Sequence, residues 1–392
     1  MNKLTFKHTK RLCYSGYVVQ AIVNNFVPLL FVFFHEHYNI SLIKITFIVT
    51  FNFMIQLFID LASAMFVDRI GYKISVMLSN LLCAAGMILL TILPELTRDP
   101  FVGILIAVSV YAIGGGLLEV IINPIIESCP SDNKEAAMSI LHSFYSWGCV
   151  AVILFSTIFF KLAGIERWKQ ITILWTIVPL INLIMFPLVP VAAAAGKRDK
   201  SMRPSVLIRS KGFLMMLIMM LAAGASEMTV SQWVSAFAET GLNVSKTVGD
   251  IAGTMFFALL FGLSRTIYGR LGSRLDLLRS MRVCSFVCIG SYLLIALSPS
   301  PVLALIGCGL CGFSVGIFWP GTVSLTAKRY VSGGTLVFSL LAFAGDVGCT
   351  AGPTLAGAAA AATGDRLGIG IGSAAVFPML MAVCVLVLCK RK

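Results

Sequence analysis

Carboxylates inside long apolar segments are the residues of this sequence with the clearest potential for chemistry. Glu119 lies four residues before Asn123 in one such segment, so a helix there places a carboxyl group and an amide on the same face. An ionised carboxylate is costly inside a bilayer, and it needs a partner, an aqueous cavity or a bound proton. We therefore predict that Glu119 couples protons or binds a substrate, with permanent pairing to a cation as the alternative.

Two further acids have a similar setting. Glu227 is followed one turn later by Ser231 and then by Gln232 and Trp233, which together offer hydrogen-bonding and stacking groups along one helix. We predict that these residues contact a substrate or form a gate. Asp346 lies among glycines that permit close helix contact and bending, so it either contacts a substrate or bonds backbone groups at a kink.

Aromatic side chains with polar tips form a second class of candidates. His142, Tyr145 and Trp147 lie close together in the chain, which favours the lining of a cavity, although aromatic residues also gather at membrane interfaces. His142 is either a proton relay or a hydrogen-bonded structural residue. Trp319, which precedes Pro320, is another cavity candidate because aromatic faces stack on sugar rings or flat apolar solutes.

The composition indicates what kind of element must position these residues. The chain has 392 residues, of which 58% are hydrophobic and only 12% are charged, and its mean hydropathy is +0.94. Soluble domains carry roughly 25% charged residues, so these values exclude an ordinary soluble protein and a disordered one. The apolar runs are long and uninterrupted, which favours spanning helices over a β-barrel.

A spanning helix needs about 20 apolar residues, and the sequence offers room for twelve of them. They are predicted at residues 12–35, 42–67, 74–94, 100–126, 136–161, 168–191, 211–238, 246–268, 279–298, 301–326, 333–358 and 367–389. The expected fold class is therefore an all-α polytopic membrane protein with twelve transmembrane helices.

Basic residues are unevenly shared between the connections. The formal net charge is +13, and with the predicted helices 23 of the 30 Lys and Arg residues, Arg265 among them, fall on the side of the two termini, against seven on the other side. By the positive-inside rule the side with 23 is cytoplasmic. The positive charge thus indicates orientation, and no nucleic-acid partner is expected.

The longest polar stretch lies near the middle of the chain and follows the sixth predicted helix. We interpret residues 196–211 as a cytoplasmic linker between an N-terminal six-helix bundle, 1–195, and a C-terminal six-helix bundle, 212–392. The halves also repeat short patterns. Gly116 precedes Pro124 by eight residues, and Gly312 precedes Pro320 by the same spacing, which favours duplicated units related by pseudo-symmetry.

A second repeated pattern carries a resemblance to a known family. The loop after the second helix reads Asp68-Arg69-Ile-Gly71-Tyr-Lys73, which resembles the cytoplasmic signature loop of the major facilitator superfamily. This resemblance implies that Asp68, Arg69 and Lys73 stabilise one conformation of an alternating-access cycle. The alternative is that Arg69 and Lys73 are only positive-inside anchors.

The same loop pattern returns in the second half of the chain. The stretch Gly269-Arg270-Leu-Gly-Ser-Arg274 lies 201 residues further on, with Gly269 in place of the acid. The resemblance assigns Arg270 and Arg274 to a second copy of the conformational latch. Because the acid is missing, this copy is expected to be the weaker of the two.

A closer resemblance is to the fucose-permease-like sugar symporter branch of that superfamily. It rests on the stretches Glu119-x-x-x-Asn123-Pro124, Gly224-Ala-Ser-Glu227 and Trp319-Pro320, which are similar to segments of that branch. Members known as sugar symporters also carry an acid in the first helix. The corresponding stretch here has only amides, and the resemblance places three of them at the substrate site: Gln20, Asn24 and Asn25.

The expected function is secondary active transport, by alternating access, of a small polar organic solute, with a sugar favoured and protons as the coupling ion. The alternatives are a proton-driven exporter of drugs or metabolites and a membrane sensor or scaffold without transport. No enzyme activity, metal or cofactor is expected, because there is no Cys/His ligand cluster, Walker loop or dinucleotide fingerprint. We expect a monomer in the bacterial plasma (inner) membrane, with the lipid bilayer, protons and a small-molecule substrate as partners.

Overall fold

Helices form all the regular secondary structure in the part of the chain that the computed structural model describes. That part comprises residues 4–40, 42–191, 204–237, 253, 255–271, 274–298, 300–331, 334–364 and 366–390. The first half contains α1 (Phe6–Asn25), η1 (Val27–Leu30), α2 (Phe31–Tyr38), α3 (Leu42–Ile70), α4 (Tyr72–Leu96), α5 (Pro100–Ser128), α6 (Lys134–Ala163), η2 (Ile165–Arg167), α7 (Trp168–Met185) and η3 (Phe186–Leu188). The second half contains α8 (Pro204–Arg209), α9 (Lys211–Ala236), α11 (Phe256–Leu271), α12 (Leu277–Leu297), α13 (Pro301–Val315), α14 (Phe318–Arg329), α15 (Gly334–Ala362), α16 (Leu367–Ser373) and α17 (Val376–Lys390).

The all-helical membrane fold that the sequence predicts is confirmed. Among the described residues, ten helical stretches are long and apolar enough to cross a membrane. The first predicted span corresponds to α1, η1 and α2, and the eighth to α11. Two predicted segments lie partly outside the described residues: the start of the eighth span, at 246–252 and 254, and the linker, at 196–203.

Among the described residues, three predicted spans are each divided between two α-helices, which corrects the sequence-based boundaries. The interruptions fall after α1, between α13 and α14, and between α16 and α17. Each begins near the fourth residue before a proline: Pro28, Pro320 and Pro378. A proline ring conflicts with the carbonyl group of that fourth residue and supplies no amide hydrogen, so the helix bends or ends there.

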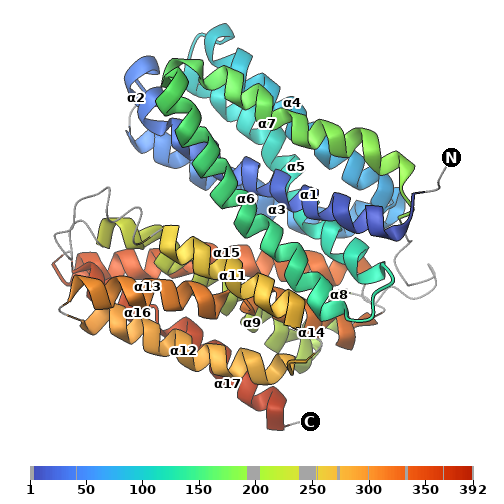
Figure 1. Ribbon diagram of the computed structural model, residues 1–392, viewed down its shortest axis with the longest axis vertical. Coiled ribbons are helices and arrows are strands. Elements are labelled where there is room, and N and C mark those ends of the chain that lie inside the picture. The colour runs from blue at the N-terminus through green and yellow to red at the C-terminus, as the bar shows by residue number, and fades with distance from the viewer. Residues whose placement is uncertain are drawn as a thin grey trace. The chain divides into compact units, whose positions relative to one another are not determined.

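Figure 1 labels the helices along the chain, and the contacts of the chain divide them into two units. Unit 1 comprises Met1–Pro130, Trp147–Ser201 and Ser332–Ser339. Unit 2 comprises Ser131–Ser146, Met202–Val331 and Leu340–Lys392. Two long helices, α6 and α15, therefore contribute residues to both units.

Within unit 1, α5 is the central helix. It contacts α1, α3 and α4, and most of its residues are buried. The hydroxyl of Ser79 on α4 donates a 2.9 Å hydrogen bond to the carbonyl oxygen of Gly114 on α5. These contacts fix the rotation of α5 about its axis, and they thereby fix the direction in which Glu119 points.

Within unit 2, α9 is held from several sides. It contacts α13, α14 and α17. The hydroxyl of Tyr292 on α12 donates a 2.8 Å hydrogen bond to the carbonyl oxygen of Ser226, and the indole nitrogen of Trp233 donates a 3.0 Å bond to the carbonyl oxygen of Pro353 on α15. The backbone of α9 is thus held by α12 at Ser226, one residue before Glu227.

The approach of α15 to α9 requires a glycine, which gives a first testable prediction. A Cβ atom at Gly348 would lie 2.0 Å from the carbonyl oxygen of Leu221. Gly348→Ala is therefore expected to destabilise the protein by about 1–3 kcal/mol, because backbone would have to move. Thermal unfolding in detergent measures the effect.

The matched control for this prediction is Gly290→Ala on α12, where a Cβ atom would meet nothing within 4 Å. That substitution is expected to leave stability unchanged or to raise it, since Ala favours a helix by up to about 1 kcal/mol over Gly. Equal unfolding temperatures for the two variants would contradict the close contact between α9 and α15.

Candidate functional site

Glu119 lies in a network of amide side chains in unit 1. The side-chain nitrogen of Gln20 on α1 is 3.0 Å from Oε2 of Glu119 and donates to it. The same nitrogen lies 3.0 Å from Oε1 of Gln56 on α3. Gln20 is buried, whereas Glu119 is half-buried. Three helices thus place a carboxylate beside hydrogen-bond donors and acceptors of fixed orientation.

The network continues along α3 to the other predicted amide of α1. Nε2 of Gln56 donates a 2.8 Å hydrogen bond to Oδ1 of Asn24. Nδ2 of Asn52 donates a 3.2 Å bond to the same oxygen. Asn52 and Gln56 are 5% and 1% exposed, so both amides are held away from lipid by their partners. Burial without such bonds would be costly.

The structure places the remaining residues of this group at the edges of the network. Asn123 accepts a 3.1 Å hydrogen bond from the hydroxyl of Tyr17 and donates a 2.9 Å bond to the backbone carbonyl of Glu119. Asn25 turns elsewhere, since its amide nitrogen contacts the carbonyl oxygen of Ala21 and Sγ of Cys149. Gln20, Asn24 and Asn123 therefore gather around Glu119, and Asn25 does not.

Sequence reasoning missed the contribution of α3. Asn52 and Gln56 are four residues apart, and Asp60 follows at the same spacing, so the three share one helix face. All three are buried. This polar stripe in an otherwise apolar helix was the available signal, and it indicates the face of α3 that turns inward.

The acid of unit 2 has a cationic partner. Nη2 of Arg265 on α11 lies 3.3 Å from Oε2 of Glu227, with side-chain exposures of 3% and 14%. The guanidinium carbon of Arg265 lies 3.8 Å from the centre of the Phe261 ring, a distance suited to a cation–π contact. Glu227 is therefore an ion-pair partner in this structure.

The other nitrogens of Arg265 are also bonded. Nε donates to the carbonyl oxygen of Gly316 at 3.0 Å. Nη1 donates to the carbonyl oxygen of His142 at 3.1 Å and to Oγ of Ser146 at 3.0 Å. Such a set of partners is what permits a guanidinium group to be buried.

This burial corrects the sequence-based count of basic residues. The sequence places Arg265 among the orientation-setting cations of the cytoplasmic side, but it is 3% exposed and lies within the helices of unit 2. It is not a positive-inside anchor. The reason is that Arg265 is paired and stacked, and hydropathy counts take no account of partners.

The structure separates the residues that follow Glu227. Ser231 is half-buried and bonds Sδ of Met228, and Gln232 is exposed. Trp233 points to α15 through its bond to Pro353. Among the residues predicted beside Glu227, none is in the ion pair, whose partner comes from α11.

The predicted candidates of α14 and α15 lie next to each other. Trp319 is 8% exposed and Asp346 is 7% exposed. A Cβ atom at Gly345 would lie 2.3 Å from Cη2 of Trp319, so the indole ring covers the backbone beside Asp346. The carbonyl oxygen of Asp346 accepts a 3.1 Å bond from the hydroxyl of Thr350.

The aromatic residues predicted in α6 differ in how far they are exposed. The His142 side chain is buried, Tyr145 is half-buried, and Trp147 is 39% exposed. The backbone of His142 and the hydroxyl of Ser146 bind Arg265. The stretch therefore serves the ion pair of unit 2 through a carbonyl group and a serine that sequence reasoning did not single out.

The signature loop is built around a glycine and an acid. Gly71 has φ of +87°, a value that side-chain-bearing residues rarely adopt, and it lets α4 begin directly after α3. Asp68 accepts a hydrogen bond from the hydroxyl of Thr335, at the start of α15, and Oγ1 of Thr335 lies 3.0 Å from the Tyr72 hydroxyl. The start of a helix attracts negative charge, which favours Asp68 in this position.

The basic residues of both loop copies lie at the surface. Arg69, Arg270 and Arg274 are exposed, and Lys73 is half-buried. An acid from another helix lies beside the second copy. Glu135, near the start of α6, accepts a 3.1 Å bond from the hydroxyl of Tyr268 and pairs with Lys328.

The Asp68 contact gives a second testable prediction. In a double-mutant cycle, Asp68→Ala and Thr335→Val are expected to show a coupling free energy of about 0.5–1.5 kcal/mol, because each removes the same hydrogen bond. Asp68 is exposed, which limits the value. Thermal unfolding of the four proteins measures it, with Arg69→Gln as the exposed control. Additive effects of the two substitutions would contradict the contact.

No group of three or more His, Cys, Asp or Glu residues that could hold a metal ion is present among the described residues. Among the described residues, two polar centres stand out: the Glu119 network and the Arg265–Glu227 pair. The first offers a carboxylate among amides, and the second is an internally neutralised charge.

Comparisons with known proteins agree with the all-helical membrane fold. Residues 13–353 match the family model described as the Major Facilitator Superfamily. The E. coli fucose:proton symporter FucP has a TM-score of 0.81 at 14% identity, covering 98% of this chain and 99% of that chain. The proton:xylose symporter XylE has a TM-score of 0.79 at 12% identity, covering 98% of this chain and 95% of that chain. A human organic anion transporter has a TM-score of 0.72 at 14% identity, covering 97% of this chain and 99% of that chain. At these identities the likeness shows the fold, and no curated protein sequence matches the chain.

Proposed function

Because this chain belongs to the major facilitator superfamily, we propose that it moves a small polar organic solute, with a sugar or related polyol favoured, by proton-coupled alternating access. It is a multi-pass membrane transport protein and not an enzyme. Rocking of helix bundles around a site near the middle of the bilayer is the general mechanism of such transporters.

The observation that carries the proposal is the Glu119 network. A solute rich in hydroxyl groups needs donors and acceptors in alternation, and a carboxylate beside Gln20, Gln56 and Asn24 offers both. Glu119 is half-buried, whereas Gln20 and Gln56 are buried. Amides do not titrate, so Glu119 is the member of the network best placed to exchange a proton.

The Arg265–Glu227 pair supports the assignment of the proton to Glu119. The carboxylate of Glu227 is 3.3 Å from a buried guanidinium group, which offsets part of the cost of burying its charge. Glu227 is thus proposed to stay ionised during transport, with the pair acting as a structural tie between α9 and α11. His142 is proposed to hold Arg265 through its backbone rather than to relay protons.

Two of the structural relatives, FucP and XylE, bear names that describe them as proton symporters of sugars, which is consistent with the proposal. A third is named as an organic anion transporter. An anionic solute would need an uncompensated cation, and Arg265 is already neutralised by Glu227. The polar centres therefore favour a neutral solute.

The proposal includes an orientation and a division of the chain. Both termini and residues 196–211 are placed on the cytoplasmic side of a bacterial plasma membrane, with 1–195 and 212–392 as the two bundles. The excess of Lys and Arg on that side supports this orientation. A monomer is expected to be sufficient for transport.

Uptake by proteoliposomes tests the proposal. The purified protein is reconstituted, an inward proton gradient is imposed, and accumulation is measured for a panel of neutral sugars, polyols and amphipathic drugs. We expect at least one sugar or polyol to accumulate only while the gradient is present. Accumulation that is unaffected by collapse of the gradient would contradict proton coupling.

The alternatives predict different results in the same vesicles. Efflux of amphipathic drugs without uptake of any sugar would favour the exporter. The absence of flux for every compound, in vesicles where the protein is folded, would favour a sensor or scaffold. The amides gathered around Glu119 argue against a drug site, which is expected to have a wide Met and Phe lining.

A further inference from the structure

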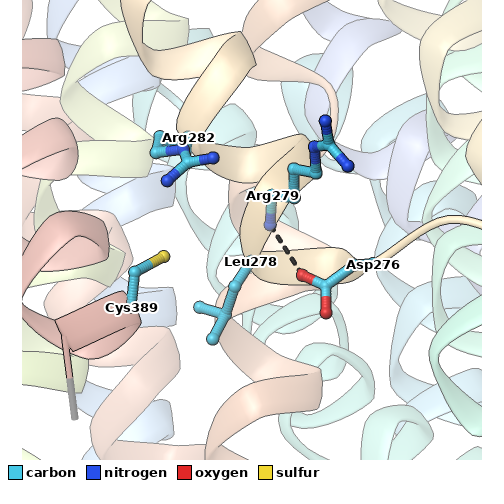
Figure 2. A pocket seen from close by; sticks show the side chains of 5 residues that line it. All are labelled: Asp276, Leu278, Arg279, Arg282 and Cys389. Atoms are coloured by element: carbon cyan, nitrogen blue, oxygen red, sulfur yellow. Dashed lines mark hydrogen bonds between the residues drawn. The ribbon is translucent and has the colours of Figure 1, made fainter. Parts of the chain in front are cut away.

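A pocket of about 370 Å³ opens in unit 2, where α12 begins and α17 ends. It is lined by Asp276, Leu278, Arg279 and Arg282 at the start of α12 and by Cys389 near the end of α17. Figure 2 shows the two arginine side chains and the Cys389 thiol around this opening. None of these residues belongs to either polar centre described above.

The charge of the pocket suits an anion. Arg279 and Arg282 are three residues apart and share a helix face. Among the described residues, neither guanidinium group has a hydrogen-bond or ion-pair partner. The carboxylate of Asp276 accepts a 2.8 Å bond from the backbone nitrogen of Arg279 and caps the helix. The positive end of the α12 dipole adds to the attraction.

Phosphate oxygens are ligands that arginine binds well. The planar guanidinium group presents its donors in a fork that matches two phosphate oxygens at once. Two such groups on one face of α12 can engage one phosphate or two adjacent oxygens of a phosphodiester. This chemistry is shared by free phosphate and by a phospholipid headgroup.

The surface beside the pocket favours a phospholipid headgroup over free phosphate. Val283 and Phe286 continue the face of Arg279 and Arg282 along α12, and they are 56% and 54% exposed. On α17, Val383 and Val387 are 57% and 37% exposed. An apolar surface on spanning helices contacts lipid chains. A ligand that places a phosphate in the pocket would therefore have hydrocarbon chains along these residues.

We propose that the pocket between α12 and α17 binds the headgroup phosphate of an anionic phospholipid of the surrounding bilayer. With the orientation proposed above, this lipid belongs to the cytoplasmic leaflet, and that part of the proposal rests on the proposed function. The binding site itself does not depend on transport or on the substrate. Basic pockets between spanning helices on the cytoplasmic side are suited to anionic headgroups.

Native mass spectrometry of the full chain in detergent tests this proposal. The protein is titrated with dioleoylphosphatidylglycerol and, separately, with dioleoylphosphatidylcholine. We expect one phosphatidylglycerol molecule to be retained in preference to phosphatidylcholine. Arg279→Gln with Arg282→Gln is expected to weaken this binding by about tenfold or more, because charge-assisted hydrogen bonds are lost.

Two variants control for charge and folding. Arg209→Gln with Lys211→Gln removes the same charge from exposed positions of unit 2 outside the pocket, and it is expected to bind phosphatidylglycerol as the wild type does. Arg279→Lys with Arg282→Lys keeps the charge without the guanidinium fork and is expected to give an intermediate affinity. Thermal unfolding in detergent verifies that each variant is folded.

A second readout locates the lipid. Maleimide labelling of Cys389, followed by peptide mapping, is expected to be slower in phosphatidylglycerol vesicles than in phosphatidylcholine vesicles, and the difference is expected to vanish in the Arg279→Gln, Arg282→Gln variant. Equal retention of both lipids by the wild type, or full retention of phosphatidylglycerol by this variant, would overturn the proposal. Displacement of the lipid by excess inorganic phosphate would overturn it in favour of a free-phosphate site.

Discussion

Arg265→Gln is expected to abolish transport and to lower the stability of the protein by about 3–5 kcal/mol, the cost of leaving one member of a buried ion pair without its partner. The substitution removes the bond to Glu227 at 3.3 Å and the bonds to Gly316, His142 and Ser146. Glu227 would then be a charged group within the helices without its cation. Thermal unfolding in detergent and uptake in proteoliposomes measure the two effects.

Three variants separate charge from packing at this pair. Arg265→Lys keeps the charge but not the planar fork, so it is expected to recover only part of the stability. Arg265→Gln combined with Glu227→Gln leaves no charge, and it is expected to be more stable than Arg265→Gln alone. Arg270→Gln, on the same helix but exposed, is the control. A double variant that is less stable than the single one would refute the ion pair.

Glu119→Gln is expected to eliminate proton-driven accumulation of the substrate while exchange of substrate across the membrane continues. The amide oxygen of the new side chain can accept the bond that Gln20 donates to Glu119 at 3.0 Å, so the network keeps its shape. The new side chain has no proton to exchange. Accumulation is expected to fall by about tenfold or more, a free-energy change of about 1.4 kcal/mol or more.

Two measurements distinguish this outcome from a general loss of function. Counterflow of labelled substrate, without a proton gradient, is expected to continue at a rate close to that of the wild type. Asp132→Asn, which changes an exposed acid, is expected to leave accumulation unchanged. If Glu119→Gln accumulates substrate with full proton dependence, Glu119 is not the coupling group.

The sequence by itself determined the helical membrane fold, because the free energy of placing a segment in lipid depends on the composition of that segment alone. Long apolar runs therefore predicted the spans without knowledge of their neighbours. The Asp68 loop was recognisable for a related reason. Its turn requires Gly71 at a positive φ of +87°, a local demand that leaves a local pattern in the sequence.

Helix interruptions were only partly predictable. Pro28, Pro320 and Pro378 coincide with breaks, yet Pro124 and Pro353 lie inside continuous helices. A proline removes one backbone bond in every case, and the packing around it decides whether the helix continues. The local sequence therefore shows where a helix can be interrupted, but not whether it is interrupted.

The candidate acids could be identified from the sequence because few of the 17 Asp and Glu residues fall within predicted spans. Their partners were not identifiable in this way. Gln56 lies 63 positions before Glu119 in the chain, and the two are joined through Gln20, which bonds to both. The rotation of α1, α3 and α5 about their axes brings these side chains together, and it results from packing between helices.

Arg265 is the clearest example of what only the tertiary structure decided. By sequence it is one basic residue among several at the end of a span, and by structure it is buried against Phe261 and bonded to Glu227. The physical reason is that hydropathy measures a side chain against lipid or water. The energy of a buried charge depends instead on the groups that other helices bring to it.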